Sequence, residues 1–273
     1  MTFLPKSELP PLLRAIHDPP RRLHLRGNGG SDLLARPAVA VVGARACSPY
    51  GAQVARMLGR ELAAAGVVVV SGLARGVDGE AHRGALQAGG HTVAVLGCGV
   101  DRDYPAAHAR LAREISERSL IVSEYEAGVE PAPWHFPARN RMIAGLSAAT
   151  IVVEARERSG ALITADFALE EGREVFAVPG EITSSLSAGT NALLRLGATP
   201  VTSAGDVLES LGITPPAKRP KSRHPLLELM PATADELARR SGLGAADVAA
   251  QLAALELDAL TGEADGIYRA LGP

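Results

Sequence analysis

Short apolar runs alternate with longer segments of helical period from residue 38 onward. The short runs are rich in Val, Ile and Ala without polar alternation, which is typical of strands that helices cover on both faces of a parallel sheet. We expect strands at residues 38–42, 67–70, 92–96, 120–122, 150–153, 174–178 and 199–201. We expect helices near residues 51–65, 78–88, 105–117, 137–147, 160–171 and 189–196. The alternation predicts the α/β class, with a doubly wound, mostly parallel sheet.

The pattern changes after residue 211. Residues 212–224 contain three prolines and four cations without an apolar period, which predicts a semi-rigid linker. Beyond it, residues 225–230, 233–241 and 245–257 predict short helices, and residues 260–264 and 266–270 predict a hairpin. Thr233 and Glu236 have the spacing of a capping box, so this tail reads as a helix-turn-helix with a wing. The expected parts are an N-terminal extension (1–37), a central domain (38–211), the linker (212–224) and a winged-helix-like domain (225–273).

The composition is that of a globular chain, since 47% of the 273 residues are hydrophobic and 21% are charged. No apolar run approaches the length of a membrane-spanning helix, and the start lacks a basic region followed by an apolar one, so we expect a cytoplasmic protein without membrane contact. The two cysteines, Cys47 and Cys98, have no ligand spacing around them. This argues against a disulfide scaffold and against structural zinc, and we expect no metal and no cofactor.

The net charge of −2 conceals an uneven distribution. Residues 38–211 carry a net −4 and residues 225–273 a net −5, whereas residues 1–37 carry +3 and residues 212–224 carry +4. Bulk charge therefore gives no support for nucleic-acid binding by the central domain. An anion site there must be a local cluster of arginines and backbone amides.

Two loops that follow expected strands have the composition of such a cluster. In parallel sheets of this kind, ligands bind beyond the carboxyl ends of the strands. The first loop begins GARACSPYG and the second SGLARGVD, and each combines an arginine with small residues that leave backbone N–H groups accessible. The candidates for phosphate binding are Gly43, Arg45 and Ser48 in the first loop and Ser71, Gly72, Ala74, Arg75 and Gly76 in the second. The alternative is that both loops are ordinary strand-to-helix turns with solvated arginines.

The segment WHFPARNR, residues 134–141, combines two aromatic side chains with two arginines in a chain that is only 3% aromatic. Phe136 and Trp134 are candidates for stacking on bases, and Arg139, Asn140 and Arg141 for contacts with phosphates. Alternatively, Phe136 is buried at a helix start and Arg139 is paired internally. Both interpretations can hold for different residues.

Two further features carry two interpretations each, and the cysteines carry one. Gly160 and Thr164, in the turn 159–164, offer N–H and hydroxyl groups to a ligand, and plain helix capping is the alternative. Asp78 and His82 share one helix face, either as an acid/base or metal-binding pair, or with Asp78 as a helix cap and His82 packed beneath the loop. We expect Cys47 and Cys98 to be inert.

Six motifs, taken in order, resemble the DprA/Smf family, known as DNA processing protein A. They are GARACSPYG, SGLARGVDGEAHRGAL, GCGVDRDYP, FPARNRMIAGLS, SGALITADFALEEGREVFAVPG and GTNALLRLGA. The resemblance runs from about residue 9 to residue 211 and is weaker in the tail. It implies an extended Rossmann-like domain that binds single-stranded DNA without a base code, forms a homodimer and helps to load the recombinase RecA during natural transformation, with no catalytic residues.

The resemblance also implies a set of site residues. The family's phosphate pocket corresponds to Gly43, Arg45 and Ser48, and its second loop to Ser71, Gly72, Ala74, Arg75 and Gly76. Its Arg-Asn-Arg motif corresponds to Arg139, Asn140 and Arg141, preceded by Phe136, and its later turn corresponds to Gly160 and Thr164. These are the residues that the local chemistry already singles out.

The chain departs from the family at both ends. Many members have a helical SAM-like domain before the sheet, whereas about 37 residues precede it here. In the tail, residues 245–258 correspond to a recognition helix but contain three acids and no Lys or Arg. Because such a helix needs donors for DNA, we expect the tail to contact protein instead.

The rival hypothesis is a nucleotide-processing enzyme, such as a nucleoside monophosphate phosphoribohydrolase. That family has a PGGxGT motif, and here Glu181 replaces the second glycine after Pro179 and Gly180. A dehydrogenase is less consistent still, because no GxGxxG follows the first strand.

Overall fold

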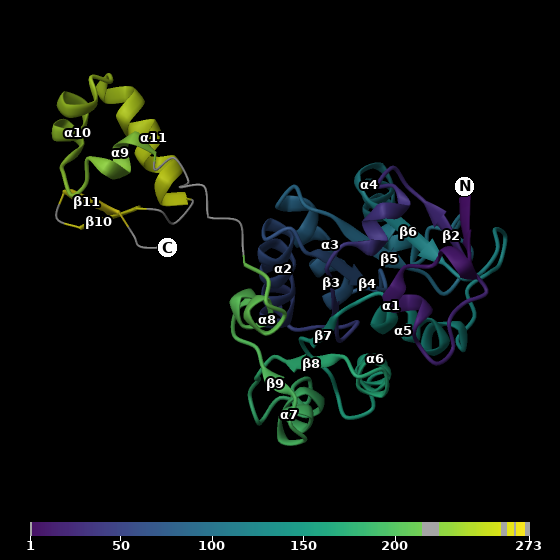
Figure 1. Cartoon of the computed structure of the whole chain (residues 1–273). Coiled ribbons are helices and arrows are strands. Elements are labelled where there is room, and N and C mark those ends of the chain that lie inside the picture. The colour runs from purple at the N-terminus through teal and green to yellow at the C-terminus, as the bar shows by residue number, and fades with distance from the viewer. Residues whose placement is uncertain (1, 215–223, 258–260, 265, 271–273) are drawn as a thin grey trace. The chain divides into compact units, whose positions relative to one another are not determined.

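The structure is a computed structural model, and it describes residues 2–214, 224–257, 261–264 and 266–270. The chain divides into two units, Met1–Pro215 and Pro216–Pro273 (Figure 1). The expected linker, residues 212–224, falls mostly outside the described residues. None of the helices within the described ranges is long and apolar enough to cross a membrane.

The larger unit is built on one nine-stranded sheet in the order β1-β2-β6-β5-β4-β3-β7-β8-β9. All seven expected strands are confirmed within two residues at each end, and they are parallel to one another. Their bounds are β3 Ala38–Val42, β4 Val68–Ser71, β5 Thr92–Val95, β6 Leu120–Ser123, β7 Ala149–Val152, β8 Glu174–Ala177 and β9 Thr199–Pro200. Successive strands are added outward from β3 to β6, and the chain then returns to place β7 on the other side of β3. The strand order therefore reverses between β3 and β7, where doubly wound sheets bind ligands.

The N-terminal residues extend this sheet, which the sequence analysis does not anticipate. β1 (Thr2–Pro5) and β2 (Arg22–Arg26) are antiparallel to each other, and β2 is antiparallel to β6. Leu23 and Leu25 are buried, while the alternating polar side chains, Arg22, His24 and Arg26, are partly or fully exposed. The remaining N-terminal elements are η1 (Lys6–Glu8), α1 (Pro11–Arg14) and η2 (Ser31–Ala35).

Helices cover both faces of the sheet, as expected for strands without polar alternation (Figure 1). On one face, Ala38, Ala40 and Val42 of β3 belong to a core with α1, α5 and α6. On the other face, Val39 and Val41 belong to a core with α2, α3 and α8. The bounds of the helices are α2 Pro49–Ala64, α3 Val77–Gln87, η3 Ala106–His108, α4 Ala109–Arg118, α5 His135–Gly145, α6 Gly160–Glu170, α7 Ala188–Arg195 and α8 Ala204–Ser210. Of these, α8 is not among the helices that the sequence analysis expects.

The smaller unit has the elements that its sequence predicts. They are α9 (Pro225–Glu228), α10 (Ala234–Ser241), α11 (Ala245–Leu257) and the antiparallel pair β10 (Thr261–Ala264) and β11 (Ile267–Ala270). Thr233 and Glu236 form the expected capping box. Buried leucines and valine from the three helices form its core. The unit is a winged-helix domain.

Candidate nucleic-acid interface

Two adjoining hollows lie at the carboxyl ends of β3, β4, β5 and β7. Their volumes are about 300 and 210 Å³, and they share Arg45, Ala74, Phe136 and Arg139 as lining residues. Ten of the expected site residues line one or both hollows: Gly43, Arg45, Gly72, Ala74, Arg75, Phe136, Arg139, Asn140, Gly160 and Thr164. Ser48, Ser71, Gly76 and Arg141 do not line them. The fold thus brings the end of the first strand, the second loop and the start of α5 to one place.

The two arginine loops are packed directly on each other. Gly76 has a φ of 75°, and a Cβ there would lie 2.2 Å from the carbonyl oxygen of Ala44. The second loop is further held by the buried Asp78 carboxylate, which accepts hydrogen bonds from the backbone N–H groups of Gly72 (3.1 Å) and Ala74 (3.3 Å). Burial raises the pKa of Asp78, while Arg139 and these N–H groups oppose the rise. Asp78 therefore shapes the loop and does not cap α3, contrary to the structural alternative of the sequence analysis.

Arg45 and Arg75 present free guanidinium groups at the hollows. Both side chains are exposed, and in the described ranges neither has an ion-pair partner. The guanidinium carbon of Arg45 lies 5.4 Å from the centroid of the Phe136 ring, which is half-buried. The Tyr104 ring stacks on Phe136, with centroids 5.4 Å apart and an interplanar angle of 25°. The sequence analysis does not single out Tyr104. Its position shortly after the GCG turn that follows β5 could have marked it as a second aromatic candidate for this sheet edge.

Arg139 has the opposite environment, because it is only 4% exposed. Its guanidinium donates to the carbonyl oxygens of Gly72 (2.9 Å) and Val95, and so ties the end of β4 to the end of β5. Gly72 accommodates it, since a Cβ there would lie 2.5 Å from Nη2 of Arg139. Burial lowers the pKa of Arg139 to about 10, so the side chain stays charged at neutral pH beneath both hollows.

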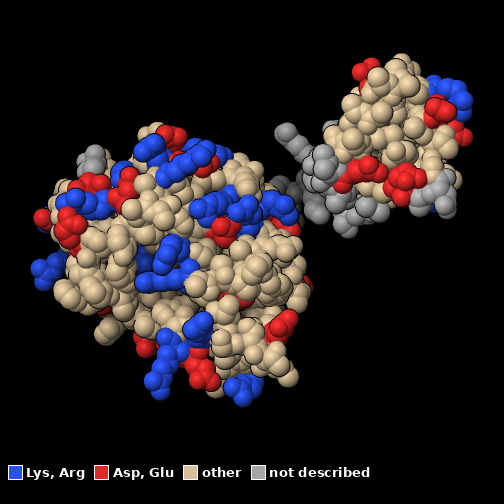
Figure 2. Space-filling view, turned by 180° about the vertical axis from the view of Figure 1, so that it is seen from behind, with Lys and Arg blue, Asp and Glu red and all other residues tan. Residues whose placement is uncertain are grey.

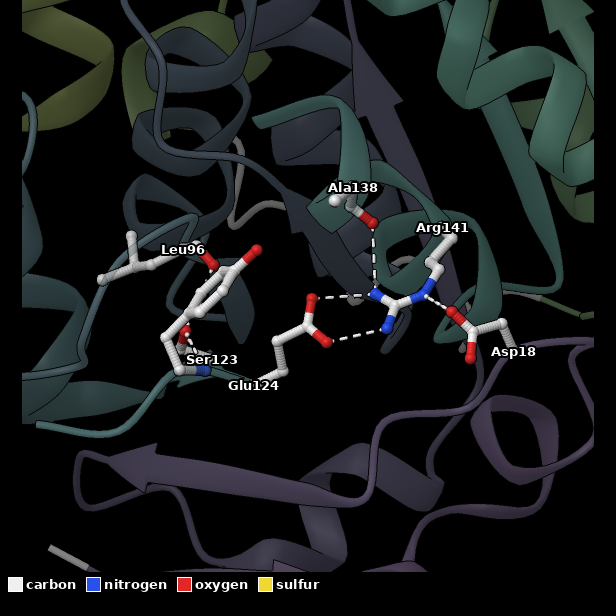
Figure 3. A network of polar contacts seen from close by, with 7 residues as sticks. Asp18, Leu96, Ser123, Glu124, Ala138 and Arg141 are labelled. Carbon is white, nitrogen blue, oxygen red and sulfur yellow. Dashed lines mark hydrogen bonds and ion pairs between the residues drawn. The ribbon is translucent and has the colours of Figure 1, made fainter. Parts of the chain in front are cut away.

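Arg141 is engaged away from the hollows. Its guanidinium forms a two-pronged ion pair with Glu124, with distances of 2.9 and 2.7 Å, and also donates to Asp18 and to the carbonyl oxygen of Ala138 (Figure 3). These contacts raise the pKa of Arg141 despite its partial burial. Arg141 therefore connects α5 to the end of β6 and to the N-terminal segment.

Asn140 connects α5 to the start of α6. The Asn140 side-chain amide donates to the carbonyl oxygen of Gly160 at 3.0 Å, and Thr164 is buried. Ser159 caps α6 by accepting from the backbone N–H of Ala161. Gly160 itself is exposed, and a Cβ there would meet nothing within 4 Å.

Ser48 caps α2, and the carboxylate of Glu154 lies at the same helix start. Glu154, directly after β7, accepts from the backbone N–H of Ser48 at 2.9 Å and from its hydroxyl at 2.5 Å. Its oxygens lie so close to Gly51 that a Cβ there would be 2.3 Å from one of them. Glu154 is 4% exposed, so the positive end of this helix faces an internal anion. The sequence analysis does not single out Glu154, although an acidic residue directly after β7, where the strand order reverses, is a candidate site residue.

His82, Cys47 and Cys98 have side chains whose pKa values are shifted by burial. His82 is buried against Thr92, and burial lowers its pKa to about 3. Both thiols are free, and burial raises the pKa of Cys98 to about 11 and also raises that of Cys47. Among the described residues, no group of three or more His, Cys, Asp or Glu side chains could hold a metal ion.

Comparison with known proteins decides the family. Residues 1–212 match the family model of DNA recombination-mediator protein A, and residues 214–266 match that of the DprA winged helix domain. The chain belongs to the DprA family. The resemblance inferred from the ordered motifs is confirmed.

Two curated DprA proteins illustrate the relationship. The DNA processing protein DprA of Streptococcus pneumoniae is 52% identical over 200 residues, covering 72% of this chain and 68% of that protein. The putative DNA processing protein DprA of Mycobacterium tuberculosis is 44% identical over 256 residues, covering 88% of this chain and 66% of that protein. The chain thus spans about two thirds of the length of these relatives.

Two solved DprA structures share the fold. The DprA of Streptococcus pneumoniae superposes with a TM-score of 0.72 at 47% identity, covering 76% of this chain and 73% of that one. The DprA of Helicobacter pylori superposes with a TM-score of 0.70 at 33% identity, covering 77% of this chain and 96% of that one. The Helicobacter protein was studied for its single-stranded DNA binding mode.

Proposed function

We propose that this DprA chain binds single-stranded DNA at the two hollows, through backbone phosphates and without sequence preference. The observation that carries the proposal is the pair of exposed arginines, Arg45 and Arg75, beside the stacked rings of Tyr104 and Phe136. Guanidinium groups bind phosphates of any sequence, and an aromatic ring stacks on any base. Duplex DNA has no unstacked base to offer the rings, so a single strand is the fitting ligand.

Local charge supports the proposal where bulk charge does not. On the face of the larger unit shown in Figure 2, Lys and Arg side chains gather in separate clusters with acidic side chains between them. The buried Arg139 adds a positive charge beneath the hollows. A few cations at one sheet edge are sufficient for a short stretch of backbone, even in a domain of net negative charge.

The test is Arg45→Ala in the full chain. We expect weaker binding of every single-stranded oligonucleotide alike and a salt slope smaller by about 0.7, the value for one phosphate contact on a single strand. Arg36→Ala is the matched control, because Arg36 is exposed, lies shortly before the amino end of β3 and lines neither hollow. Loss confined to one sequence, or equal effects of the two variants, would refute the proposal.

We further propose that the protein forms a homodimer and hands its strand to the recombinase RecA during natural transformation. The recombination-mediator family supports the RecA role. The exposed apolar side chain of Leu196 (85% exposed), at the end of α7, supports a self-association surface. The growth rate of RecA filaments on single strands tests the first role, and we expect faster growth when this protein coats the strands. The mass in solution of wild type and Leu196→Arg tests the second.

The winged-helix unit is proposed to contact protein and not DNA. Its helix α11, Ala245–Leu257, contains no Lys or Arg, and a helix that reads DNA needs such donors. Removal of residues 225–273, which keeps the cations of residues 212–224, is expected to leave the affinity for single-stranded and duplex DNA unchanged. A clear loss of duplex binding in the shortened protein would contradict this role.

We propose no catalytic step for the site. The rival phosphoribohydrolase needs a clamp for a mononucleotide phosphate, whereas Glu181 interrupts the required glycine motif and Glu154 puts a carboxylate at the start of α2. Release of adenine from AMP by the purified protein would revive the rival.

A further inference from the structure

Aromatic side chains are concentrated beside the hollows far beyond what the composition predicts. The chain has nine Phe, Trp and Tyr residues, and four of them lie here: Tyr104, Tyr125, Trp134 and Phe136. Tyr104 and Phe136 form the ring pair already described. The other two flank His135, since Tyr125 stacks on its ring with centroids 4.2 Å apart, and Trp134 meets it edge-on at 5.9 Å.

We propose that Tyr125, Trp134 and His135 form a second base-stacking subsite for single-stranded DNA, next to the Phe136 pair. This inference rests on the proposed function and extends it, because it assigns a role to a group of rings that phosphate binding leaves unused. Trp134 is 71% exposed, so its face is available to a base. We call the three side chains the Trp134 platform.

The platform is held in place by the ends of β5 and β6. The Nδ1 atom of His135 lies within hydrogen-bond distance, 3.2 Å, of the carbonyl oxygen of Gly97. The backbone N–H of Tyr125 donates to the Ser123 hydroxyl at 3.1 Å, and that hydroxyl donates to the carbonyl oxygen of Cys98 at 2.7 Å. Rings fixed in this way lose little conformational entropy when a base stacks on them.

The platform is continuous with the larger hollow. Gly97 and Cys98, which anchor the platform, also line that hollow. His135 and Phe136 are consecutive residues in the first turn of α5, and both pack against Gly97. A strand with one base on Phe136 therefore needs to advance only a short distance to place another base on the platform.

Charge indicates that bases, and not phosphates, face the platform. The neighbouring loop carries Glu124, Glu126 and Glu130, and each is paired with an arginine: Arg141, Arg22 and Arg102 respectively. Arg141 also pairs with Asp18, and Arg102 with Asp101, so these described side chains carry more negative than positive charge. None of the three arginines is free, unlike Arg45 and Arg75. Stacking there should therefore contribute affinity that does not depend on salt, in contrast to Arg45.

The experiment uses the full chain and its single tryptophan. We expect oligothymidylate to quench the fluorescence of Trp134, and an abasic oligonucleotide with the same phosphates to bind without quenching. Trp134→Ala should weaken oligothymidylate binding about 5- to 150-fold with an unchanged salt slope, and Trp134→Phe should restore most of it. Leu169→Ala is the matched control, because Leu169 is an exposed apolar side chain near the far end of α6.

The outcomes separate this inference from the proposed function. If Arg45→Ala weakens binding while Trp134→Ala does not, and the fluorescence stays unquenched, the phosphate site stands and the platform is refuted. If the wild-type protein binds no single-stranded DNA, both are refuted. If Trp134→Ala instead lowers only the stimulation of RecA, the platform is a protein contact and the inference is wrong.

Discussion

Two pairs of arginines meet at the same sheet edge in opposite environments. Arg45 and Arg75, on the loops after β3 and β4, are exposed and without carboxylate partners among the described residues. Arg139 and Arg141, on α5, are engaged by backbone carbonyl groups and by Glu124 and Asp18. The loop pair is available to an external phosphate, whereas the helix pair holds the framework that presents it. In the proposed site, identical side chains would thus serve two purposes: the loop pair would bind phosphate, and the helix pair would support the loops.

Removal of Arg139 is expected to have the largest effect on stability. Arg139→Met takes away the link between the ends of β4 and β5, and it removes the positive charge that opposes the rise in the pKa of the buried Asp78. We expect a loss of about 3–5 kcal/mol in the free energy of unfolding, as for other broken buried charge contacts. Urea unfolding measures it, with Arg45→Met as the control at an exposed position. Equal free energies of unfolding for the two variants would contradict the distinction between the helix arginines and the loop arginines.

Removal of both loop arginines should instead affect binding alone. We expect the double variant Arg45→Ala with Arg75→Ala to bind single-stranded DNA about 30-fold more weakly, roughly 2 kcal/mol, and to lower the salt slope by about 1.4. Its unfolding curve should match wild type, because neither side chain is buried. A salt titration of oligothymidylate binding gives both quantities. A reduced affinity with an unchanged slope would mean that these arginines do not bind phosphate.

Most of the parallel sheet is predictable from the sequence, since its buried strands are continuous apolar runs. β2 is different, because Leu23 and Leu25 of RLHLR alternate with polar side chains. This is the pattern of a half-buried strand and not the continuous apolar run from which the other strands are predicted. The loops of the site are predictable for a similar reason, as strand ends of a parallel sheet share one edge.

Which arginine is free is not predictable, because it depends on partners far away in the chain. Arg139 reaches Gly72, 67 residues earlier, and Arg141 reaches Asp18, 123 residues earlier. Glu154 likewise reaches Ser48 across 106 residues. Local motifs specify which side chains gather at an edge, and only the packed fold determines which of them remain unpaired.

A pH titration separates the framework from the loop arginines. His82 has a pKa of about 3 in the fold, against 6.5 unperturbed, so the folded protein keeps it neutral while the unfolded chain takes up a proton below pH 6.5. Stability is therefore complete above pH 6.5 and falls by about 1.4 kcal/mol per pH unit toward pH 3, or about 2 kcal/mol by pH 5. His82→Gln should flatten this dependence in urea unfolding at pH 7 and pH 5. The loop arginines take no part in this dependence, so Arg45→Ala should show the same difference in stability between pH 7 and pH 5 as wild type. A difference that Arg45→Ala alters would contradict the division.

The smallest effect is expected at Arg141, which tests the comparison most closely. Arg141→Met removes a partly buried ion pair with Glu124 and an exposed contact with Asp18, and we expect a loss of about 1 kcal/mol in the free energy of unfolding. Since Arg141 does not line the hollows, the affinity for single-stranded DNA and its salt slope should stay at wild-type values. Glu124→Gln is the matched control, because it breaks the same pair from the other side and should destabilise to a similar extent. If Arg141→Met lowers the salt slope as Arg45→Ala does while Glu124→Gln leaves it unchanged, Arg141 leaves Glu124 for a phosphate when DNA binds, and α5 then belongs to the binding surface as well as to the framework.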